Sequence, residues 1–173
     1  HKNVEVVVFP SALDVRMVAA EGMATGSQGA SAKPCGASTG ENCMKMFLDA
    51  GCTHVLCGHS ERRASNHESD DDVAEQVILA LELGMTPIVC IGETKHERDA
   101  KKLEKVLEKQ LKKIPVDERI VIAYEPLWAI GTGSTPDPAD IQTVAVLIKQ
   151  KMGRSVQKFL YGGSLDSKNC HDI

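Results

Sequence analysis

Two side chains that could transfer protons stand at the ends of short apolar runs. Glu125 directly follows residues 120–124, and His59 follows residues 53–57 after a single glycine. A carboxylate covered by a loop can act as a general base in a dry site. The turn around His59 can begin a helix, and a helix N-terminus keeps an imidazole neutral. Each residue also has an ordinary interpretation, as a surface acid or as a hydrogen-bonded histidine at a strand end.

A glycine-rich turn provides the second chemical signal. Gly162, Gly163 and Ser164 follow residues 158–161. Backbone N–H groups in such a turn can bind a phosphate group without any net positive charge. Gly-Gly pairs also occur in plain turns, so this feature alone is weak. Its occurrence with Glu125 and His59 at the ends of strands in one chain favours a shared site.

The elements that must position these residues alternate along the chain. Short runs that are apolar or β-branched predict strands, and the stretches between them carry apolar stripes at helical spacing. Strands are predicted at residues 4–9, 17–20, 53–57, 86–91, 120–124 and 158–161, and helices within 41–50, 73–81, 103–114 and 137–152. Continuously apolar strands separated by helices indicate a parallel sheet covered by helices.

Such a sheet can close into a barrel or stay open and doubly wound, and periodicity does not distinguish the two. No G-x-G-x-x-G motif follows the first predicted strand, which disfavours the dinucleotide-binding form of the open sheet. The 173 residues suit a single domain spanning residues 1–173.

The composition excludes several classes of function. The chain is 42% hydrophobic and 25% charged, with a net charge of −4, so no broad basic surface for nucleic acid is expected. No apolar run approaches the roughly 18–20 residues of a membrane span, and we expect a cytoplasmic protein. The six cysteines form no C-x-x-C pair, so we expect no metal site and mostly buried, reduced thiols.

The chain resembles the triosephosphate isomerase family. The matching segments follow the family order and cover residues 58–63, 89–93, 123–133 and 161–164. The run Ala-Tyr-Glu-Pro-Leu-Trp-Ala-Ile-Gly-Thr-Gly at 123–133 is the most specific of them. The resemblance implies a TIM (β/α)₈ barrel of the α/β class, and it covers nearly the whole chain.

The resemblance also implies an activity and its residues. The family interconverts dihydroxyacetone phosphate and D-glyceraldehyde 3-phosphate through an enediol(ate) in glycolysis and gluconeogenesis, without a cofactor or metal. Glu125 is then expected as the base, His59 as the neutral group that polarises the carbonyl, and Glu61 as a supporting carboxylate. Cys90 is expected to pack behind the base.

Binding and assembly roles follow from the same resemblance. Gly131, Ser164, Gly162 and Gly163 are expected to bind the substrate phosphate. The expected lid consists of Pro126, Leu127, Trp128, Ala129, Ile130, Gly131, Thr132 and Gly133. A dimer loop with Thr39, Gly40 and Glu41, and Arg62 as the cross-subunit partner of Glu41, imply a homodimer.

The chain departs from the family pattern in several places. A complete barrel takes about 250 residues, whereas about six βα units are visible here. The first strand, with its catalytic lysine, and the last strand are absent, and the helix expected near Val15 and Arg16 is predicted to be lacking. The loop 23–39 is predicted to be longer than usual, with Glu21 and Gly22 in place of Gln and Asn. Two alternatives therefore stay open: a non-catalytic fragment, or another phosphate-binding barrel enzyme.

We expect the natural polypeptide to be longer than these residues, because a barrel with unpaired edge strands is incomplete. Its intact mass should exceed the 18.7 kDa of the 173 residues. A mass spectrum of the natural protein with its main peak near 18.7 kDa would contradict this expectation.

Overall fold

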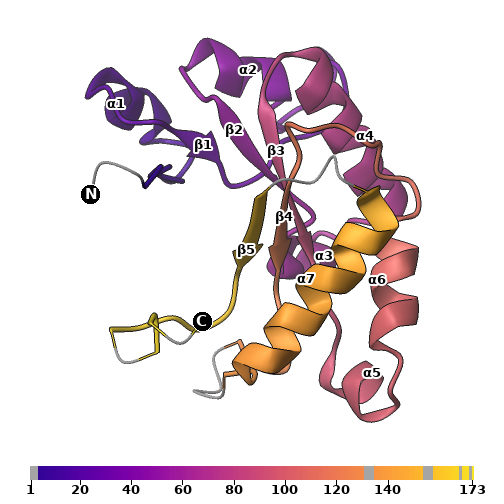
Figure 1. The fold of residues 1–173 in the computed structure, drawn as a ribbon. Helices are drawn as coiled ribbons and strands as arrows, with labels where there is room; N and C mark the ends of the chain where they lie inside the picture. The colour runs from indigo at the N-terminus through magenta and orange to yellow at the C-terminus, as the bar shows by residue number, and fades with distance from the viewer. Residues whose placement is uncertain (1–3, 131–134, 154–157, 168, 172) are drawn as a thin grey trace.

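Five parallel strands form one sheet, in the order in which they occur along the chain (Figure 1). The computed structural model describes residues 4–130, 135–153, 158–167, 169–171 and 173. The strands are β1 (Gly26–Ser27), β2 (His54–Cys57), β3 (Thr86–Ile91), β4 (Val121–Tyr124) and β5 (Lys158–Tyr161). Strands β2 to β5 confirm the predicted ones within one residue at each end.

The register of the sheet brings the carboxyl ends of the strands to a common edge. Cys57 of β2 pairs with Val89 of β3, and Ile91 at the end of β3 pairs with Tyr124 at the end of β4. Tyr124 in turn pairs with Tyr161 at the end of β5. The residues that follow these strands are therefore neighbours in space although far apart in sequence.

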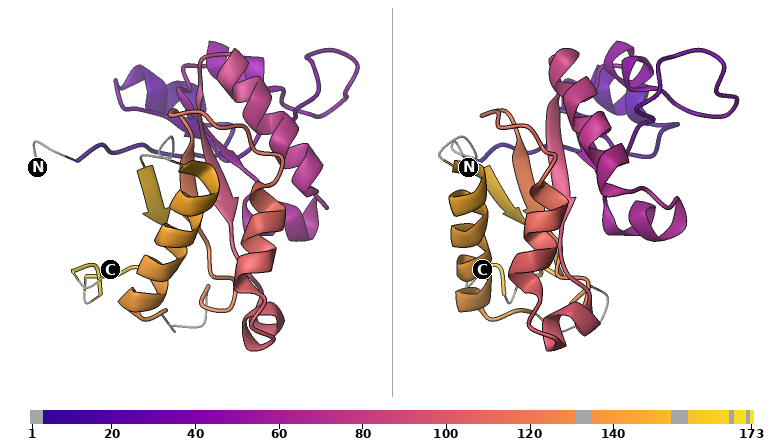
Figure 2. Two further views of the ribbon diagram at one scale, coloured as in Figure 1. Left: turned by 45° about the vertical axis from the view of Figure 1, so that its right-hand side comes forward. Right: turned by 90° about the vertical axis from the view of Figure 1, so that its right-hand side faces the viewer.

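Seven helices lie within the described part of the chain, and the longer ones cover one face of the sheet (Figures 1 and 2). They are α1 (Val15–Ala20), α2 (Met44–Asp49), α3 (Ser60–Ser65), α4 (Asp70–Glu82), α5 (Lys95–Asp99), α6 (Leu103–Leu111) and α7 (Pro138–Met152). None of these helices is both long enough and apolar enough to cross a membrane.

The two longest helices begin at strong sequence signals. Ser69 and Asp72 form a capping box at the start of α4, with each side chain bonded to the other residue's backbone N–H. Asp137 caps α7 by accepting a hydrogen bond from the N–H of Ala139 at 2.9 Å, and Pro138 occupies the first turn. Local capping thus starts α7 at the predicted Asp137, whereas it starts α4 three residues before the predicted range of 73–81.

Both faces of the sheet carry apolar side chains, because successive residues of each apolar strand point to opposite faces. The face under the helices carries Val55, Cys57, Val89, Ile91, Ile122 and Tyr124, which pack with Val73, Val77, Leu107, Leu111, Val144 and Ile148. The opposite face carries a smaller cluster of Ile88, Cys90, Val121 and Ala123, against which Phe9 and Leu56 pack. Burial on two faces explains why these strands are apolar throughout.

The predicted strand at residues 17–20 is wrong, because these residues belong to helix α1. Val15 is buried, and Val18 and Ala19 are half-buried, which is the i, i+3, i+4 spacing of a helix. Met17 is 64% exposed, as expected on the outer side of a helix. The same helix begins at Val15, so the prediction that a helix near residues 15–16 is lacking is also corrected: the helix is present but only six residues long.

The strand in this region is β1, so the loop that follows it begins later in the sequence than predicted. The predicted long loop 23–39 contains β1, so the irregular segment begins only at Gln28. Glu21 and Gly22 close helix α1 and do not end a strand; Gly22 has a φ of +77°, which suits a glycine after a helix. The residues that follow the strand are therefore Gln28 and Gly29.

The predicted first strand is reduced to a single bridge. Val8 pairs in parallel with Thr25, and the N–H of Gly26 donates to the carbonyl of Val8 at 2.9 Å. Val4 and Val6 are 65% and 69% exposed, so this segment buries little apolar surface. Its β-branched composition predicts the extended path but not the extent of pairing.

The reduced state predicted for the cysteines is wrong for one pair. Cys35 and Cys43 form a disulfide, with their Cα atoms 5.3 Å apart. The other four are free, and three of these are buried: Cys52, Cys57 and Cys90 are buried, and Cys170 is exposed. The separation of eight residues spans a loop, so spacing in the sequence alone did not reveal the contact.

Truncation of a buried side chain on β4 should destabilise the fold far more than a matched change at the surface. Ile122 on β4 is fully buried, so Ile122→Ala should lower the free energy of unfolding by about 2–5 kcal/mol. Ile78→Ala, on a side chain that is 44% exposed, should cost about 1 kcal/mol or less. Urea unfolding of the full-length protein followed by circular dichroism measures both, and similar losses would contradict the described core.

Candidate functional site

A carboxylate and an imidazole meet at the carboxyl edge of the sheet. Glu125 follows β4, and His59 follows β2 after Gly58; the end of β3 lies between these strands. The Nε2 atom of His59 lies 3.2 Å from Oε1 of Glu125. The two candidates for proton transfer are therefore in contact. They are far apart in the sequence, since Ser60, which follows His59, precedes Glu125 by 65 positions.

His59 is oriented by the helix that it begins. It is the N-cap of α3, and its Nδ1 atom accepts a hydrogen bond from the N–H of Glu61 at 3.3 Å. A nitrogen that accepts from an N–H carries no proton, so a neutral ring carries its proton on Nε2, toward Glu125. The hydrogen bond to Nδ1 thus directs the Nε2 atom toward Glu125.

Glu125 is held almost completely out of solvent. Its N–H donates to the carbonyl of Ile91 at 2.7 Å, which continues the pairing of β3 and β4 beyond the last strand residue. Its Oε2 atom accepts from the N–H of Ser60 at 3.0 Å, and the residue is only 5% exposed. A buried carboxylate with two donors has a defined direction and limited hydration, as a general base requires.

Two glycines make room for Glu125. A Cβ atom on Gly92 would lie 1.8 Å from the carbonyl oxygen of Glu125, and one on Gly162 would lie 2.9 Å from its Cγ atom. The N–H of Gly162 donates to the carbonyl of Tyr124 at 2.7 Å, so the residue after β5 lies next to Glu125. The glycine after Tyr161 is therefore a packing requirement beside the acid.

A second buried carboxylate, Glu93, ties the beginning of the predicted lid to the sheet. Glu93 is fully buried and accepts from the Tyr124 hydroxyl at 3.0 and 3.1 Å and from Nε1 of Trp128 at 2.8 Å. The backbone N–H of Leu127 also donates to the carbonyl of Glu93 at 3.1 Å. Burial, together with the adjacent carboxylate, raises the pKa of Tyr124, so its hydroxyl keeps the proton that it donates.

Arg98 extends this network to the outer helices. Its guanidinium donates to Glu93 at 3.3 Å, lies 4.9 Å from the centre of the Trp128 ring, and forms an ion pair with Asp140 on α7. Sequence reasoning assigned no role to Glu93 or Arg98. The available signal for Glu93 was an acid close behind a continuously apolar strand, two residues after the end of β3, whereas Glu125 directly follows β4.

The other predicted site residues differ in how closely they approach His59 and the predicted lid. Ser164 lies beside the lid, with its Oγ atom 3.5 Å from the carbonyl oxygen of Ala129. Glu61 contacts His59 through its backbone N–H, and its side chain is exposed. The predicted lid and phosphate residues Gly131, Thr132 and Gly133 lie outside the described residues.

Cys90 lies on β3 beside the carboxylate of Glu125. It is 2% exposed, and burial together with the nearby carboxylate of Glu125 raises the pKa of its thiol well above the usual value. A thiol that stays protonated is a poor nucleophile. Its position therefore indicates packing rather than chemistry.

An open cleft reaches the imidazole from the solvent. It has a volume of about 570 Å³ and is lined by Phe9, Gln28, Leu56, His59, Glu61, Arg62, Ser65 and Asn66. His59 is therefore accessible to a small molecule from this cleft, whereas Glu125 lines a separate cleft of about 310 Å³ together with Ser60, Cys90 and Leu127. No group of three or more His, Cys, Asp or Glu side chains suited to a metal ion occurs in the part of the chain described here.

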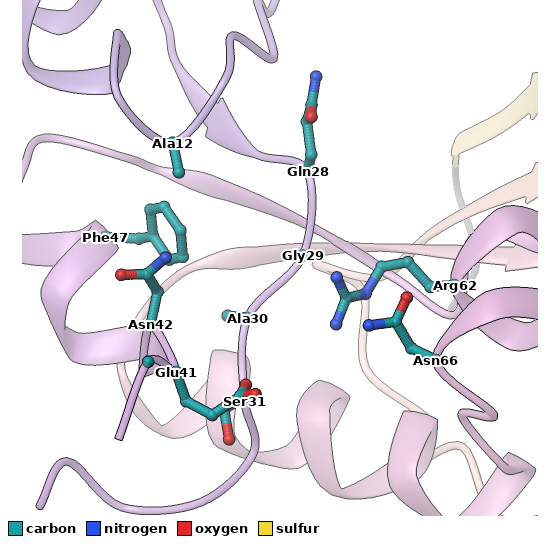
Figure 3. A pocket seen from close by; sticks show the side chains of 11 residues that line it. Ala12, Gln28, Gly29, Ala30, Ser31, Glu41, Asn42, Phe47, Arg62 and Asn66 are labelled. Carbon is teal, nitrogen blue, oxygen red and sulfur yellow. The ribbon is translucent and has the colours of Figure 1, made fainter. Parts of the chain in front are cut away.

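The predicted dimer residues lie around an adjacent pocket of about 270 Å³ (Figure 3). Glu41, Gly40 and Arg62 all line it, and Figure 3 shows Arg62 and Asn66 on the side opposite Phe47. Within this chain, the guanidinium of Arg62 bonds Glu68 at 2.6 and 2.9 Å.

Functional side chains gathered at the carboxyl ends of parallel strands, in the loops that lead into helices, are characteristic of α/β-barrel proteins. Residues 1–173 match the family model described as triosephosphate isomerase. The chain belongs to the triosephosphate isomerase family.

Individual relatives agree with this assignment. A protein named triosephosphate isomerase from Alkalilimnicola ehrlichii is 43% identical over 88% of this chain and 66% of its own length. One of the same name from Candida albicans is 40% identical over 99% of this chain and 75% of its own length, and one from Mycoplasmopsis agalactiae is 42% identical over 85% and 58%. The chain thus spans between 58% and 75% of the length of these relatives.

The free cysteines should differ sharply in reactivity. Burial raises the pKa values of Cys52, Cys57 and Cys90, which keeps these thiols protonated and covered at pH 8, whereas Cys170 is exposed. Iodoacetamide at pH 8 should modify Cys170 in the native protein and the other three only after unfolding. Peptide mass mapping measures this, and rapid native alkylation of Cys90 would contradict the covered position behind Glu125.

Proposed function

We propose that the protein containing this chain is a triosephosphate isomerase, which interconverts dihydroxyacetone phosphate and D-glyceraldehyde 3-phosphate. The single observation that carries the proposal is the contact of 3.2 Å between His59 and the buried Glu125 at the carboxyl edge of the sheet. Membership of the family, over the whole chain, supports the substrate class.

In this proposal, Glu125 removes a proton from the substrate carbon next to the carbonyl group. The electron pair of the broken C–H bond forms the carbon–carbon double bond of an enediolate, and the carbonyl oxygen takes the negative charge. The protonated Glu125 then returns a proton to the neighbouring carbon, which completes the isomerisation. No electron leaves the substrate, and the same carboxylate acts as base and then as acid.

His59 stabilises the charge that develops on the oxygen. Because Nδ1 is occupied by the N–H of Glu61, Nε2 can donate to the carbonyl oxygen and its proton can move between the two oxygens. Its contact with Glu125 must then be exchanged for contacts with the substrate. Glu61 contributes through its backbone, by holding the ring in the required tautomer.

The phosphate and lid assignments belong to the same proposal. Gly131, Ser164, Gly162 and Gly163 hold the phosphate group, and the lid from Pro126 to Gly133 excludes water so that the enediolate does not lose its phosphate. The bonds of Glu93 to Leu127 and Trp128 support a fixed starting point for this lid. The contact between Ser164 and Ala129 supports a phosphate site beside it.

We also propose a cytoplasmic homodimer. The docking residues Thr39, Gly40 and Glu41 lie on a segment that projects beside Arg62, and Glu41 and Arg62 line the same pocket. A second copy whose Glu41 reaches Arg62 would add a carboxylate to the Arg62–Glu68 pair. The resemblance to the family supports this assembly. In the same proposal, the catalytic lysine expected from the resemblance belongs to the full-length protein.

Replacement of the base should abolish most of the activity. Glu125→Gln in the full-length enzyme keeps the size of the side chain but cannot take a proton, so kcat should fall by roughly 10²–10⁴ with little change in KM. His59→Gln should also slow the reaction, because an amide can polarise a carbonyl but relays protons poorly.

A coupled assay with a dehydrogenase measures both variants. Glu82→Gln, on an exposed carboxylate of α4, is the matched control and should keep the activity of the unmodified enzyme. An unchanged kcat for Glu125→Gln would show that Glu125 is not the base. A full-length protein without activity before any substitution would favour the non-catalytic alternative.

A further inference from the structure

The disulfide between Cys35 and Cys43 closes a ring around the proposed docking residues. Its two Cα atoms lie 5.3 Å apart, within the range that disulfides span. Thr39, Gly40 and Glu41 all lie between the two cysteines. The segment that would contact a second copy is therefore part of a covalent ring.

Few other interactions determine the shape of this ring. Within residues 36–42, the N–H of Ser38 donates to Gly36 at 2.8 Å and the N–H of Glu41 donates to Ser38 at 3.0 Å. One backbone bond, from the N–H of Ser31 to the carbonyl of Asn42 at 3.0 Å, ties the ring to the preceding segment. None of residues 36–42 belongs to a helix or strand. The disulfide is thus the main long-range constraint on the docking residues.

The two sulfur atoms have different surroundings. Cys43 is 5% exposed and caps α2, whose Met44 and Phe47 are buried in the core. Cys35 is exposed in the irregular segment. The disulfide therefore joins an exposed arm to a fixed point of the core, and a dissolved thiol can reach it from the side of Cys35.

We propose that the redox state of the Cys35–Cys43 pair controls how tightly two copies of this protein associate. The proposal rests on the homodimer proposed above. In the oxidised form the ring presents Thr39, Gly40 and Glu41 in a limited set of conformations. In the reduced form the same residues must be ordered on binding, and that loss of conformational entropy weakens association.

The chemistry of the switch requires a small thiol such as glutathione. The thiolate of one molecule attacks the exposed sulfur of Cys35, forms a mixed disulfide, and releases Cys43 as a thiol after protonation. A second molecule attacks the mixed disulfide, which frees the Cys35 thiol and yields glutathione disulfide. Two electrons pass to the protein, and the reverse reaction consumes glutathione disulfide. Because cytosolic disulfides are commonly transient, a cytoplasmic location suits a reversible pair.

Sedimentation of the full-length protein tests the proposal. The dimer dissociation constant is measured after equilibration with glutathione disulfide and after equilibration with reduced glutathione, and alkylation with mass spectrometry reports the state of the pair. Reduction should raise the dissociation constant on the order of tenfold or more. The double variant Cys35→Ser, Cys43→Ser should give the reduced value in both buffers. Cys170→Ser, which removes an exposed thiol outside the ring, should respond like the unmodified protein.

A second measurement separates the ring from the assembly. At concentrations where the protein is monomeric, the amides of residues 36–42 should exchange hydrogen faster after reduction; unchanged exchange would overturn the proposal. A dimer with the same dissociation constant in both buffers would overturn redox control alone and leave the proposed homodimer standing. A monomer in both buffers at micromolar concentration would instead refute the homodimer itself, and redox control of association with it.

Discussion

The close approach of β3 and β4 beyond their last paired residues determines the geometry of the whole site. At Gly92 the backbone comes so near to Glu125 that a Cβ atom would lie 1.8 Å from its carbonyl oxygen, and Gly162 approaches from the other side. Because the backbone of Glu125 is confined between neighbouring strands, its side chain is aimed at the start of α3. There it meets the N–H of Ser60 and the ring of His59 in the same turn.

Two buried carboxylates at this edge have opposite environments. Glu93 is surrounded by fixed donors from Tyr124, Trp128 and Arg98, which compensate the cost of burying its charge. Glu125 meets a backbone N–H, an imidazole and the buried thiol of Cys90, and the imidazole borders an open cleft. One acid is therefore suited to holding structure, and the other to exchanging its partner for a substrate.

Sequence patterns predicted β3 and β4 because these strands are buried on both faces and must be apolar, and they predicted β2 and β5 from shorter runs of apolar and aromatic residues. They could not predict β1, which has two residues, Gly26 and Ser27, and no apolar side chain. Residues 17–20 were wrongly predicted as a strand because they carry part of a short helical stripe of buried side chains that begins at Val15. A shared site for Glu125 and His59 was predictable because both follow strands of one parallel sheet, but β3 lies between β2 and β4, so their direct contact was not. The Glu93 network joins residues that are far apart in the sequence, and no sequence pattern indicates it. The disulfide was not predicted because the spacing of Cys35 and Cys43 in the sequence does not show that the two cysteines lie close together in the folded chain.

The sequential strand order also bears on how the chain folds as it is synthesised. Since β1 to β5 lie in the sheet in their order along the chain, each new strand pairs with the one made just before it. Growth takes place at one edge only, and no later strand has to be inserted between two strands that are already joined. The partner of every new strand has therefore already left the ribosome, and a folding intermediate can gain one βα unit at a time without undoing any contact. His59 and helix α3 precede Glu125 in the chain, so the elements that orient the imidazole are synthesised before the acid.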